Sequence, residues 1–493
     1  MTKDSRTLEH NPKDFGGVIF NPSFRKESRV MFTSVLPNLM AERPAVLPKN
    51  ALASPDQLRS LLEEAINRTL SSHTLYHSPE AFSRHSEKLN LENLVDFIYY
   101  LQSSNLNIQI ARFCGYNEHE TFCASSLCEA RSRLSPDFFK AVFDYVSDRL
   151  TDYGYKDQYW HGRTLIGIDG CTLPLENFCK TDEDRVRTKN PNRPRAECHL
   201  VCGMNLCSRL YEEFEIQPIK YKDERKAAQL IASRLEKGSV LVMDRGFHSF
   251  SMSFSMEAGL IASGHDFVQR IKKKDFCSLL QIPEENDIDE EIDIFKQLIL
   301  TSHYREEYKN DALHHRYSGK GRAFLNENCE YSYRFRLLKI KLDDDSWEYV
   351  LTTLREEDYT LEQIKEIYHM RWLIETSFLE LKYVIGLLAV HARKMDSVRQ
   401  DIYAALTLYN LSNCVIRYCE ESRAAESRRT KYEYRLNRKY AIEMCRDFFT
   451  WRFKGDEEAF VRMIQKKKTP VKPVRKFERH VLRKPDSNQD RLI

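Results

Sequence analysis

Leu165-Ile166-Gly167-Ile168-Asp169-Gly170 is a short apolar run that ends in an acidic residue and a glycine. Residues 239–247, Ser-Val-Leu-Val-Met-Asp-Arg-Gly-Phe, have the same form and bring Asp244 to the end of a second apolar run. Such runs, bounded by turn residues, are typical of buried strands. Residues 223–235 between them have a helical pattern, and a parallel pair of strands requires such a crossover. We therefore predict that Asp169 and Asp244 end two central strands at the same edge of one sheet.

A third acidic residue lies on a helix-like segment, Tyr368-His369-Met370-Arg371-Trp372-Leu373-Ile374-Glu375, which continues to Lys382. Tyr368, Arg371, Glu375 and Lys382 are three, four and seven residues apart. At about 100° per residue their side chains fall within roughly 60° of one another. A second stripe is predicted to face the core: Ile367, Ile374, Phe378, Leu381, Ile385 and Leu388. The alternative interpretation is a solvated helix face laced with charge, just as each Asp taken alone can be an ordinary turn residue.

The spacing Tyr-x2-Arg-x3-Glu-x6-Lys resembles the signature of DDE transposases from bacterial insertion sequences, in the branch called the insertion-sequence-four family. Asp244-Arg245-Gly246-Phe247 also resembles the second motif of that family. The order Asp, Asp, Glu matches the ribonuclease-H-like fold. The resemblance covers roughly residues 55–480 and implies a transposase that binds the terminal inverted repeats of its element and acts on target DNA.

The three acidic residues have the chemistry that this reaction needs. Phosphodiester cleavage and strand transfer use two divalent cations about 4 Å apart. Mg²⁺ prefers hard oxygen ligands and keeps several waters, so a few carboxylates and a substrate phosphate suffice. We expect two Mg²⁺ ions, with Mn²⁺ as a substitute. Asp169 would bridge both ions, and Asp244 and Glu375 would each complete one.

Five residues are predicted to contact DNA. By the resemblance, Tyr368 and Arg371 contact the phosphate near the transposon end. Lys382 adds a mobile point charge, and Arg245 belongs to the second motif. Trp347 lies 28 residues before Glu375, where a family member stacks a Trp on a flipped base, a contact worth roughly 1–3 kcal/mol. The alternative for Trp347 is an ordinary strand residue packed on the core.

The predicted fold class is α/β: a ribonuclease-H-like catalytic core with a mainly β insertion, an α-helical N-terminal domain and a basic C-terminal helical region and tail. The insertion is predicted because 131 residues separate Asp244 from Glu375 and residues 331–337 alternate with the period of a strand. The expected divisions are a loosely ordered N-terminus, a DNA-binding helical domain, the first part of the core, the insertion, the second part with the Glu375 helix, and the basic region. In that order they span residues 1–54, 55–155, 156–273, 274–346, 347–415 and 416–493.

Both ends of the chain carry candidate DNA-binding features. Predicted helices at 107–114 and 120–134 are joined by Gly115-Tyr116-Asn117, as in a helix-turn-helix motif whose second helix reads the major groove. Residues 122–126 and 130–133 would then face DNA, and the alternative is a helical packing domain. Residues 421–493 hold 21 Lys and Arg against 11 Asp and Glu, a net of +10 in a chain of net +3. Such a region can add salt-dependent phosphate affinity, although a solubilising tail would have the same composition.

Composition fits a multidomain protein of a reducing compartment. The chain has 493 residues, 42% hydrophobic and 30% charged, and no 18-residue apolar run that would span a membrane. Its 13 Cys form no Cys-x2-Cys pair, and we expect a bacterial cytoplasmic protein associated with the nucleoid. A zinc site at Cys198, His199, Cys202 and Cys207 is an alternative with unusual spacing.

Two other functions remain open at this stage. A catalytically inactive, domesticated transposase would bind DNA without cleaving it. A ribonuclease-H-like nuclease of repair or RNA processing would not need the Tyr and Arg of the signature. For the transposase we expect a homodimer assembled on DNA, because two element ends must be joined.

Overall fold

The structure is a computed structural model. It describes residues 52–71, 89–101, 105–117, 121–175, 183–186, 195–248, 255–280, 288–299, 315–317, 330–343, 346–390, 392–424 and 434–470. The predicted loose N-terminus, apart from residues 52–54, and the basic tail after Pro470 lie outside the described residues.

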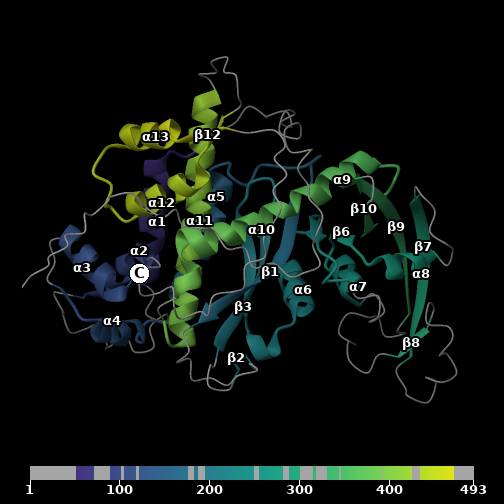
Figure 1. The fold of residues 1–493 in the computed structure, drawn as a ribbon, viewed down its shortest axis with the longest axis horizontal. Helices are drawn as coiled ribbons and strands as arrows, with labels where there is room; N and C mark the ends of the chain where they lie inside the picture. The colour runs from purple at the N-terminus through teal and green to yellow at the C-terminus, as the bar shows by residue number, and fades with distance from the viewer. Residues whose placement is uncertain are drawn as a thin grey trace, which may run out of the picture.

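Among the described residues, ten strands form one mixed sheet (Figure 1). Its first half contains β1 (Leu165–Leu175), β3 (Arg195–Asn205), β4 (Tyr211–Pro218), β5 (Val240–Met243) and β6 (Asp266–Arg270). In space the order is β4-β3-β1-β5-β6, with β2 (Arg185–Val186) also pairing with β3. β4, β3 and β1 are antiparallel, whereas β1, β5 and β6 are parallel. The predicted parallel pairing of the two Asp-bearing strands is confirmed.

One detail of that prediction is wrong, because Asp169 does not end its strand. β1 continues to Leu175, held by antiparallel pairing with β3 as far as Leu175 and Ala196. Its pairing with β5 nevertheless stops at Ile168 and Met243. Asp169 therefore lies where the parallel pair opens, and Asp244 follows directly on the same edge.

The second half of the sheet comes from the region between residues 274 and 352. β10 (Ser346–Thr352) pairs with β6, and β9 (Glu330–Asp343) and β7 (Ile288–Ile299) follow, with β8 (His315–Tyr317) outermost. The predicted β-rich insertion thus extends the central sheet instead of making a separate one. This pairing places β10 beside β6, which itself pairs with β5.

Two apolar layers cover the two faces of the sheet. Ile166 and Ile168 of β1 pack with α6 (Glu224–Arg234), α7 (Ser255–Ala262) and α8 (Lys273–Leu280). Leu165 belongs to the other layer, with α9 (Leu361–Met370), α10 (Trp372–Leu379) and α11 (Met395–Ala424). Because side chains alternate along a strand, Asp169 faces α10 and Gly170 faces α6.

The predicted helix from Tyr368 to Lys382 is segmented. α9 ends at Met370, α10 begins at Trp372, and a π-helical turn, η7 (Glu380–Ile385), follows. Gly386 then adopts a left-handed conformation at φ 106° before the short η8 (Leu387–Ala389). Five of the six predicted core residues of this segment are buried, but Leu388 is 38% exposed. The π turn and Gly386 break the 100° periodicity, so the prediction for Leu388 is wrong.

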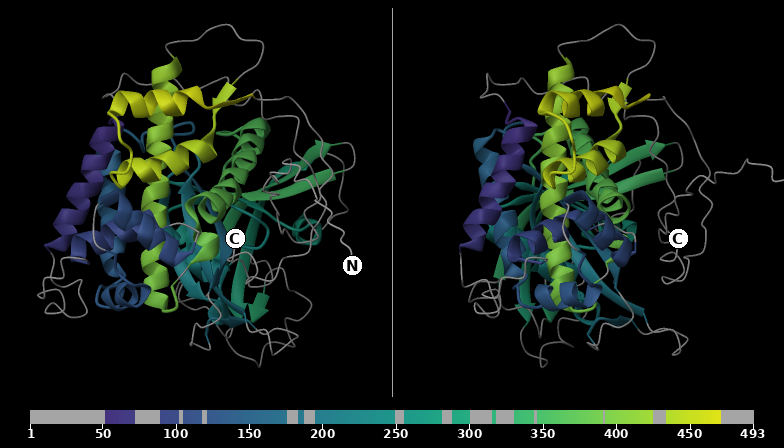
Figure 2. Two further views of the ribbon diagram at one scale, coloured as in Figure 1. Left: turned by 60° about the vertical axis from the view of Figure 1, so that its left-hand side comes forward. Right: turned by 90° about the vertical axis from the view of Figure 1, so that its left-hand side faces the viewer.

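α11 stands between the sheet and the N-terminal helices (Figure 1). These are α1 (Pro55–Leu70), α2 (Leu91–Tyr100), α3 (Leu106–Asn117), α4 (Ala124–Arg131) and α5 (Asp137–Asp152). α12 (Arg438–Phe449) and α13 (Glu457–Lys466) cross α11 on one side (Figure 2). The remaining elements are η3 (Ile219–Tyr221) and the ribbon of β11 (Tyr434–Leu436) with β12 (Lys468–Pro470). One continuous apolar core joins all of these helical regions to one face of the sheet.

No helix in the described part of the chain has the length and apolar character needed to cross a bilayer.

Candidate active site

Asp169 and Asp244 lie on the α10 face of the sheet, at the place where β1 and β5 separate. Asp169 is partly exposed, and its Oδ1 accepts a hydrogen bond of 2.8 Å from the backbone N–H of Gly170. Oδ1 of Asp244 is buried and accepts no hydrogen bond from any described residue. Nη1 of Arg270 lies 4.0 Å from this oxygen. One of the two carboxylates therefore has an oxygen with unused capacity to bind a cation.

Glu375 comes to the same place from α10, which packs on β1. Nη1 of Arg371 donates a hydrogen bond of 2.5 Å to Oε1 of Glu375. Arg371 is only 3% exposed and lies at the junction of α9 and α10. Burial opposes its charge, yet Tyr368 and the carboxylates around it raise the pKa of Arg371 above its ordinary value. The guanidinium of Arg371 therefore interacts with all three carboxylates of the predicted metal site.

The pKa of Asp169 reports the electrostatics of the whole cluster. Burial raises the pKa of Asp169 to about 7. The guanidinium of Arg371 opposes that rise, whereas the carboxylates of Glu375 and Asp244 add to it. The three predicted catalytic residues are thus close enough to act on one another's charge. The neutral form of Asp169 is therefore favoured over a wider pH range than for an ordinary carboxyl.

Two further charged residues complete the cluster, and the sequence patterns did not identify them. Glu348 on β10 is buried, and its carboxylate lies 3.5 Å from Nη1 of Arg270 on β6. Burial raises the pKa of Glu348, while Arg270 and Arg371 lower it. No periodic pattern points to either residue, because Arg270 reaches the cluster through the pairing of β6 with β5, and Glu348 through the pairing of β10 with β6.

The donor set suits a divalent ion of the Mg²⁺ type, because the site offers carboxylate oxygens and a buried Asp244 oxygen without a hydrogen bond. In the described residues, however, no three His, Cys, Asp or Glu side chains are close enough together to hold an ion as they stand. Glu375 is instead paired with the guanidinium of Arg371, so its carboxylate is not available to a metal ion in this arrangement. Asp169, Asp244 and Glu375 would hold the metal after a local rearrangement that frees Glu375.

The predicted DNA-binding residues fall in different places. Tyr368 is buried in the cluster, and its hydroxyl has no hydrogen-bond partner among the described residues. Lys382 lies on the π turn, and its charge reaches Cys171, two residues beyond Asp169 on the same face of β1. Arg245 is partly exposed in the turn after β5. These three residues surround the cluster.

Trp347 is not brought to the cluster. It precedes Glu348 on β10, so strand alternation directs its side chain to the opposite face of the sheet. There the Nζ of Lys339 lies 4.2 Å from the centre of its ring. The predicted stacking on a flipped base would need DNA to reach that other face.

The predicted helix-turn-helix differs from the structure. Residues 115–117, expected to form the turn, belong to α3, and the predicted second helix is represented by the shorter α4. Arg131, expected to face DNA, is buried and donates to Oδ1 of Asp401 at 2.6 Å and to Oε1 of Gln400 at 3.0 Å. It fastens α4 to α11. The residues of α4 that remain exposed include Ser125 and Ser126.

The zinc alternative finds no support in the described residues. Cys198 and Cys202 belong to the apolar layer on the α10 face, and alternation along β3 directs His199 to the α6 face. His199 instead meets Glu224.

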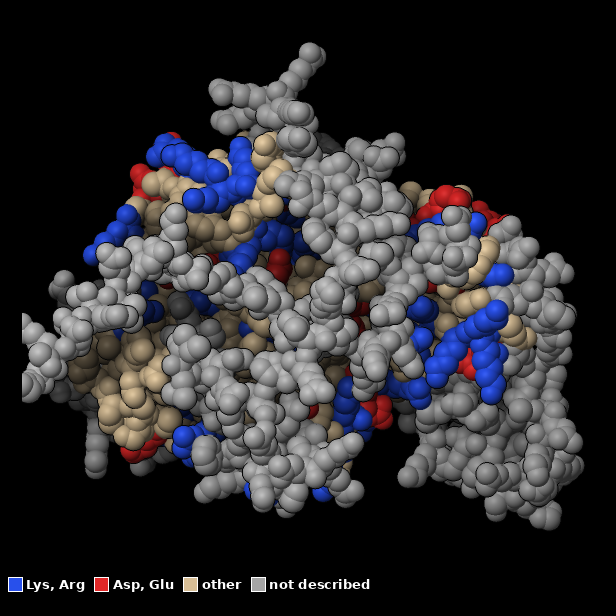
Figure 3. Space-filling model, viewed as in Figure 1, with Lys and Arg blue, Asp and Glu red and all other residues tan. Residues whose placement is uncertain are grey.

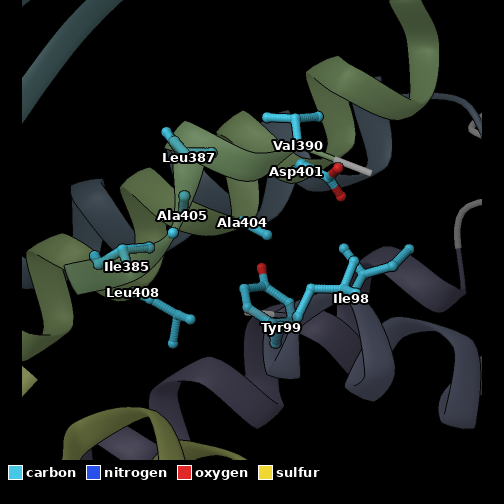
Figure 4. A pocket seen from close by; sticks show the side chains of 11 residues that line it. Ile98, Tyr99, Ile385, Leu387, Val390, Asp401, Ala404, Ala405 and Leu408 are labelled. Carbon is cyan, nitrogen blue, oxygen red and sulfur yellow. The ribbon is translucent and has the colours of Figure 1, made fainter. Parts of the chain in front are cut away.

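A small pocket lies between α2 and the segment from η7 to α11 (Figure 4). It is lined mainly by apolar residues of α2, η7, η8 and α11, among them Tyr99, Ile385, Leu387 and Ala404, with Asp401 at one end. Its lining offers a single carboxylate and no cation, so it does not belong to the cluster.

Comparison with known proteins gives one family assignment. The family model described as "Transposase DDE domain" matches residues 160–411, just over half of the chain. A search of curated proteins finds no match. Among solved structures, the chain is similar to a piggyBac transposase synaptic complex with hairpin DNA, solved by cryo-electron microscopy. The sequence identity is 9%, the TM-score is 0.40, and 84% of each chain is covered.

Proposed function

We propose a function from one premise, that this chain belongs to the family of transposase DDE domains. The protein would be the transposase of an insertion sequence of the insertion-sequence-four type, encoded in a bacterial genome. The Tyr368, Arg371, Glu375 and Lys382 spacing supports that narrower placement, as does Asp244-Arg245-Gly246-Phe247. The strand order, three antiparallel strands followed by two parallel ones, supports a ribonuclease-H-like core.

The reaction would be phosphoryl transfer at the end of the element. Water attacks the phosphorus, the P–O3′ bond breaks, and the leaving oxygen becomes a 3′-hydroxyl. That hydroxyl then attacks a phosphodiester of target DNA, so a new P–O bond forms while the P–O3′ bond of the target strand breaks and a target 3′-hydroxyl leaves. Divalent ions, when bound by Asp169, Asp244 and Glu375, would activate the attacking oxygen and stabilise the leaving one.

The observation that carries this proposal is the mutual electrostatic influence of the three acidic residues. Asp169 comes from β1, Asp244 from the end of β5 and Glu375 from α10. The carboxylates of Glu375 and Asp244 add to the rise in the pKa of Asp169. A group of carboxylates whose charges are not balanced within the protein is a site built to receive external cations. Arg371 provides a positive group that can exchange Glu375 for a DNA phosphate, because its planar fork suits either partner.

DNA contacts would extend beyond the cluster. Exposed Lys466, Lys467 and Lys468 lie at the end of α13 and the start of β12, where Lys and Arg gather on the molecular surface (Figure 3). We expect the terminal inverted repeats and target DNA as ligands and a homodimer assembled on DNA. The eleven cysteines that the structure describes are free thiols, which fits the proposed cytoplasmic location near the nucleoid.

The direct test uses the whole protein with labelled DNA from both flanks of its coding region. With Mg²⁺, we expect nicking at the element end, followed by joining of the 3′-hydroxyl to added target DNA. Asp244→Ala should abolish nicking and keep DNA binding. Binding without nicking by the unaltered protein would favour the second candidate, a domesticated DNA-binding protein, and hydrolysis without strand joining would favour a nuclease.

A further inference from the structure

A second polar cluster lies at the same sheet edge, on the α6 face. Oε1 of Glu224, the first residue of α6, is 2.9 Å from Nε2 of His199 and 2.8 Å from Nζ of Lys222. His199 is 1% exposed, and its Nδ1 is 3.4 Å from Oγ1 of Thr172 on β1. The cluster therefore connects the start of α6 to β3 and to β1.

Glu224 fits against the backbone beside both predicted catalytic Asp residues. A Cβ on Gly170 would lie 2.6 Å from Nε2 of His199 and 3.0 Å from Oε1 of Glu224. A Cβ on Gly246 would lie 3.9 Å from Oε2 of Glu224. Neither glycine has a positive φ, so conformational freedom does not explain them. At Gly170 the close approach of this cluster leaves no room for a side chain.

Glu224 also has its charge well compensated. Its contact with His199, together with Lys222, lowers the pKa of Glu224 to about 2 in spite of burial. Burial lowers the pKa of His199, so at neutral pH the ring is neutral and can donate one N–H. A carboxylate that is fully ionised and already paired is suited to holding backbone in place rather than to binding a further cation.

We propose that Glu224, held by His199, is a positioning residue that fixes the Asp169 and Asp244 segments relative to each other from the opposite face of the sheet. Its carboxylate lies against Gly170, the residue after Asp169, and approaches Gly246, two residues after Asp244. β1 and β5 share no pairing beyond Ile168 and Met243, so the two segments need another connection there. α6 supplies it, since Arg225 of the same helix also donates to the carbonyl of Gly246 at 3.4 Å. This inference rests on the proposed function only in its use of metal binding.

The first experiment compares three proteins without DNA: the unaltered chain, Glu224→Ala and Arg234→Gln. Arg234 is the matched control, because it forms ion pairs with Glu213 and Glu215 at the far end of α6. Amide hydrogen exchange should rise in peptides covering 165–172 and 240–248 for Glu224→Ala and stay unchanged there for Arg234→Gln. Mn²⁺ affinity, followed by the electron paramagnetic resonance of free Mn²⁺, should fall about tenfold or more in Glu224→Ala, as for other residues that orient ligands.

Glu224→Gln keeps the volume of the side chain and serves if Glu224→Ala exchanges faster along the whole chain. It should show the same local increase in exchange and a smaller loss of Mn²⁺ affinity. Unchanged exchange at 165–172 and 240–248 in the folded variant overturns the inference, and so does an equal effect of Arg234→Gln. A protein that binds Mn²⁺ but never nicks end DNA overturns the proposed function instead.

A double-mutant cycle tests the contact at Gly170 directly. Gly170→Ala should weaken Mn²⁺ binding because the new methyl meets Nε2 of His199. His199→Ala removes that atom, so the double variant should bind Mn²⁺ better than the sum of the two single losses predicts. Simple additivity would mean that Gly170 and His199 are not coupled, and it would remove the explanation of the glycine.

Discussion

Asp169 and Glu224 are two carboxyl groups at one edge of one sheet. They lie on opposite faces, and their pKa values are shifted in opposite directions. Burial raises the pKa of Asp169 to about 7, while His199 and Lys222 help lower that of Glu224 to about 2. Both side chains are partly exposed, so exposure alone does not separate them. The difference lies in their partners, because Glu224 has a cation at 2.8 Å and Asp169 shares Arg371 with other carboxylates.

This comparison indicates how to distinguish a binding carboxylate from a structural one. A paired carboxylate stabilises the fold, whereas an unpaired one costs stability until its ligand arrives. By this criterion Asp169, which lowers the stability of the metal-free protein, is the carboxyl suited to bind a metal. The face of α10 therefore carries the chemistry, and the face of α6 carries the support.

The largest expected effects are opposite in sign for the two residues. Asp169→Asn should reduce nicking on the order of a thousandfold or more, because each lost metal ligand removes several kcal/mol of transition-state stabilisation. The same substitution should stabilise the metal-free protein above pH 7, by a few kcal/mol at most. Because the folded-state pKa of Asp169 is raised, its cost is absent below pH about 4, grows through the window up to about 7, and is constant above it. Thermal denaturation of both proteins at pH 4.5 and 8 measures this.

Glu224→Gln is the matched contrast and should lower thermal stability at pH 8. Its stabilising effect is present at every pH well above its depressed pKa of about 2, so the deficit should persist from pH 5 to 8. If Asp169→Asn instead destabilised the metal-free protein at pH 8, the contrast between the two carboxylates would not hold.

The pH dependence of metal binding sharpens the comparison next. Because Asp169 must lose a proton to bind a cation, Mn²⁺ affinity should rise about tenfold per pH unit up to pH 7 and then level off. Isothermal titration between pH 5.5 and 8.5, in buffers of different ionisation enthalpy, would also detect the released proton. An affinity that is flat over this range would place the metal on carboxylates that are already ionised.

Arg371→Gln should change metal and DNA binding in opposite directions. Without its guanidinium, Glu375 is free to bind a cation, so Mn²⁺ affinity of the DNA-free protein should rise severalfold, while affinity for end DNA should fall by about tenfold, the loss of one charge-assisted phosphate contact. Arg438→Gln is the control, because Arg438 pairs with Glu380 at 2.7 Å in the adjoining turn and has no carboxylate of the cluster beside it. Equal gains in Mn²⁺ affinity for both variants would show a general loosening of the fold.

Sequence patterns predict the local parts of this site well. The apolar runs locate β5 and the first part of β1. The residues between β4 and β5 form α6, with Asp223 accepting from the N–H of Lys226 as its N-cap. The spacing also brings Arg371 and Glu375 into contact, because i and i+4 side chains on a helix are neighbours. These are short-range consequences of periodicity.

Long-range pairing supplied what the sequence could not. Arg270 reaches the cluster because β6 pairs with β5, and Glu348 because β10 pairs with β6. Strand pairing between distant segments leaves no periodic signal. His199 and Glu224 meet because β3 folds back along β1. Arg131 carries the charge expected of a DNA contact, yet α11 offers it Asp401 and the carbonyl of Ser397, and burial decides its role.

Lys382→Ala is expected to have the smallest effect and addresses the place where the two faces meet. Burial raises the pKa of Cys171 on the α10 face, and the charge of Lys382 opposes that rise. The same charge adds to the burial that lowers the pKa of His199 on the α6 face. The π turn removes Lys382 from the register that simple α-helical spacing implies. As a single mobile phosphate contact it should contribute a few-fold to end-DNA affinity at low salt, and its loss should lower the salt slope by about one. Fluorescence anisotropy between 50 and 200 mM salt measures both quantities.

Lys140→Ala, on α5 and paired with Asp144, is the control and should leave both unchanged. A Lys382→Ala protein with an unaltered slope and slower nicking would instead place this ammonium at the reacting phosphate, on the side of Asp169.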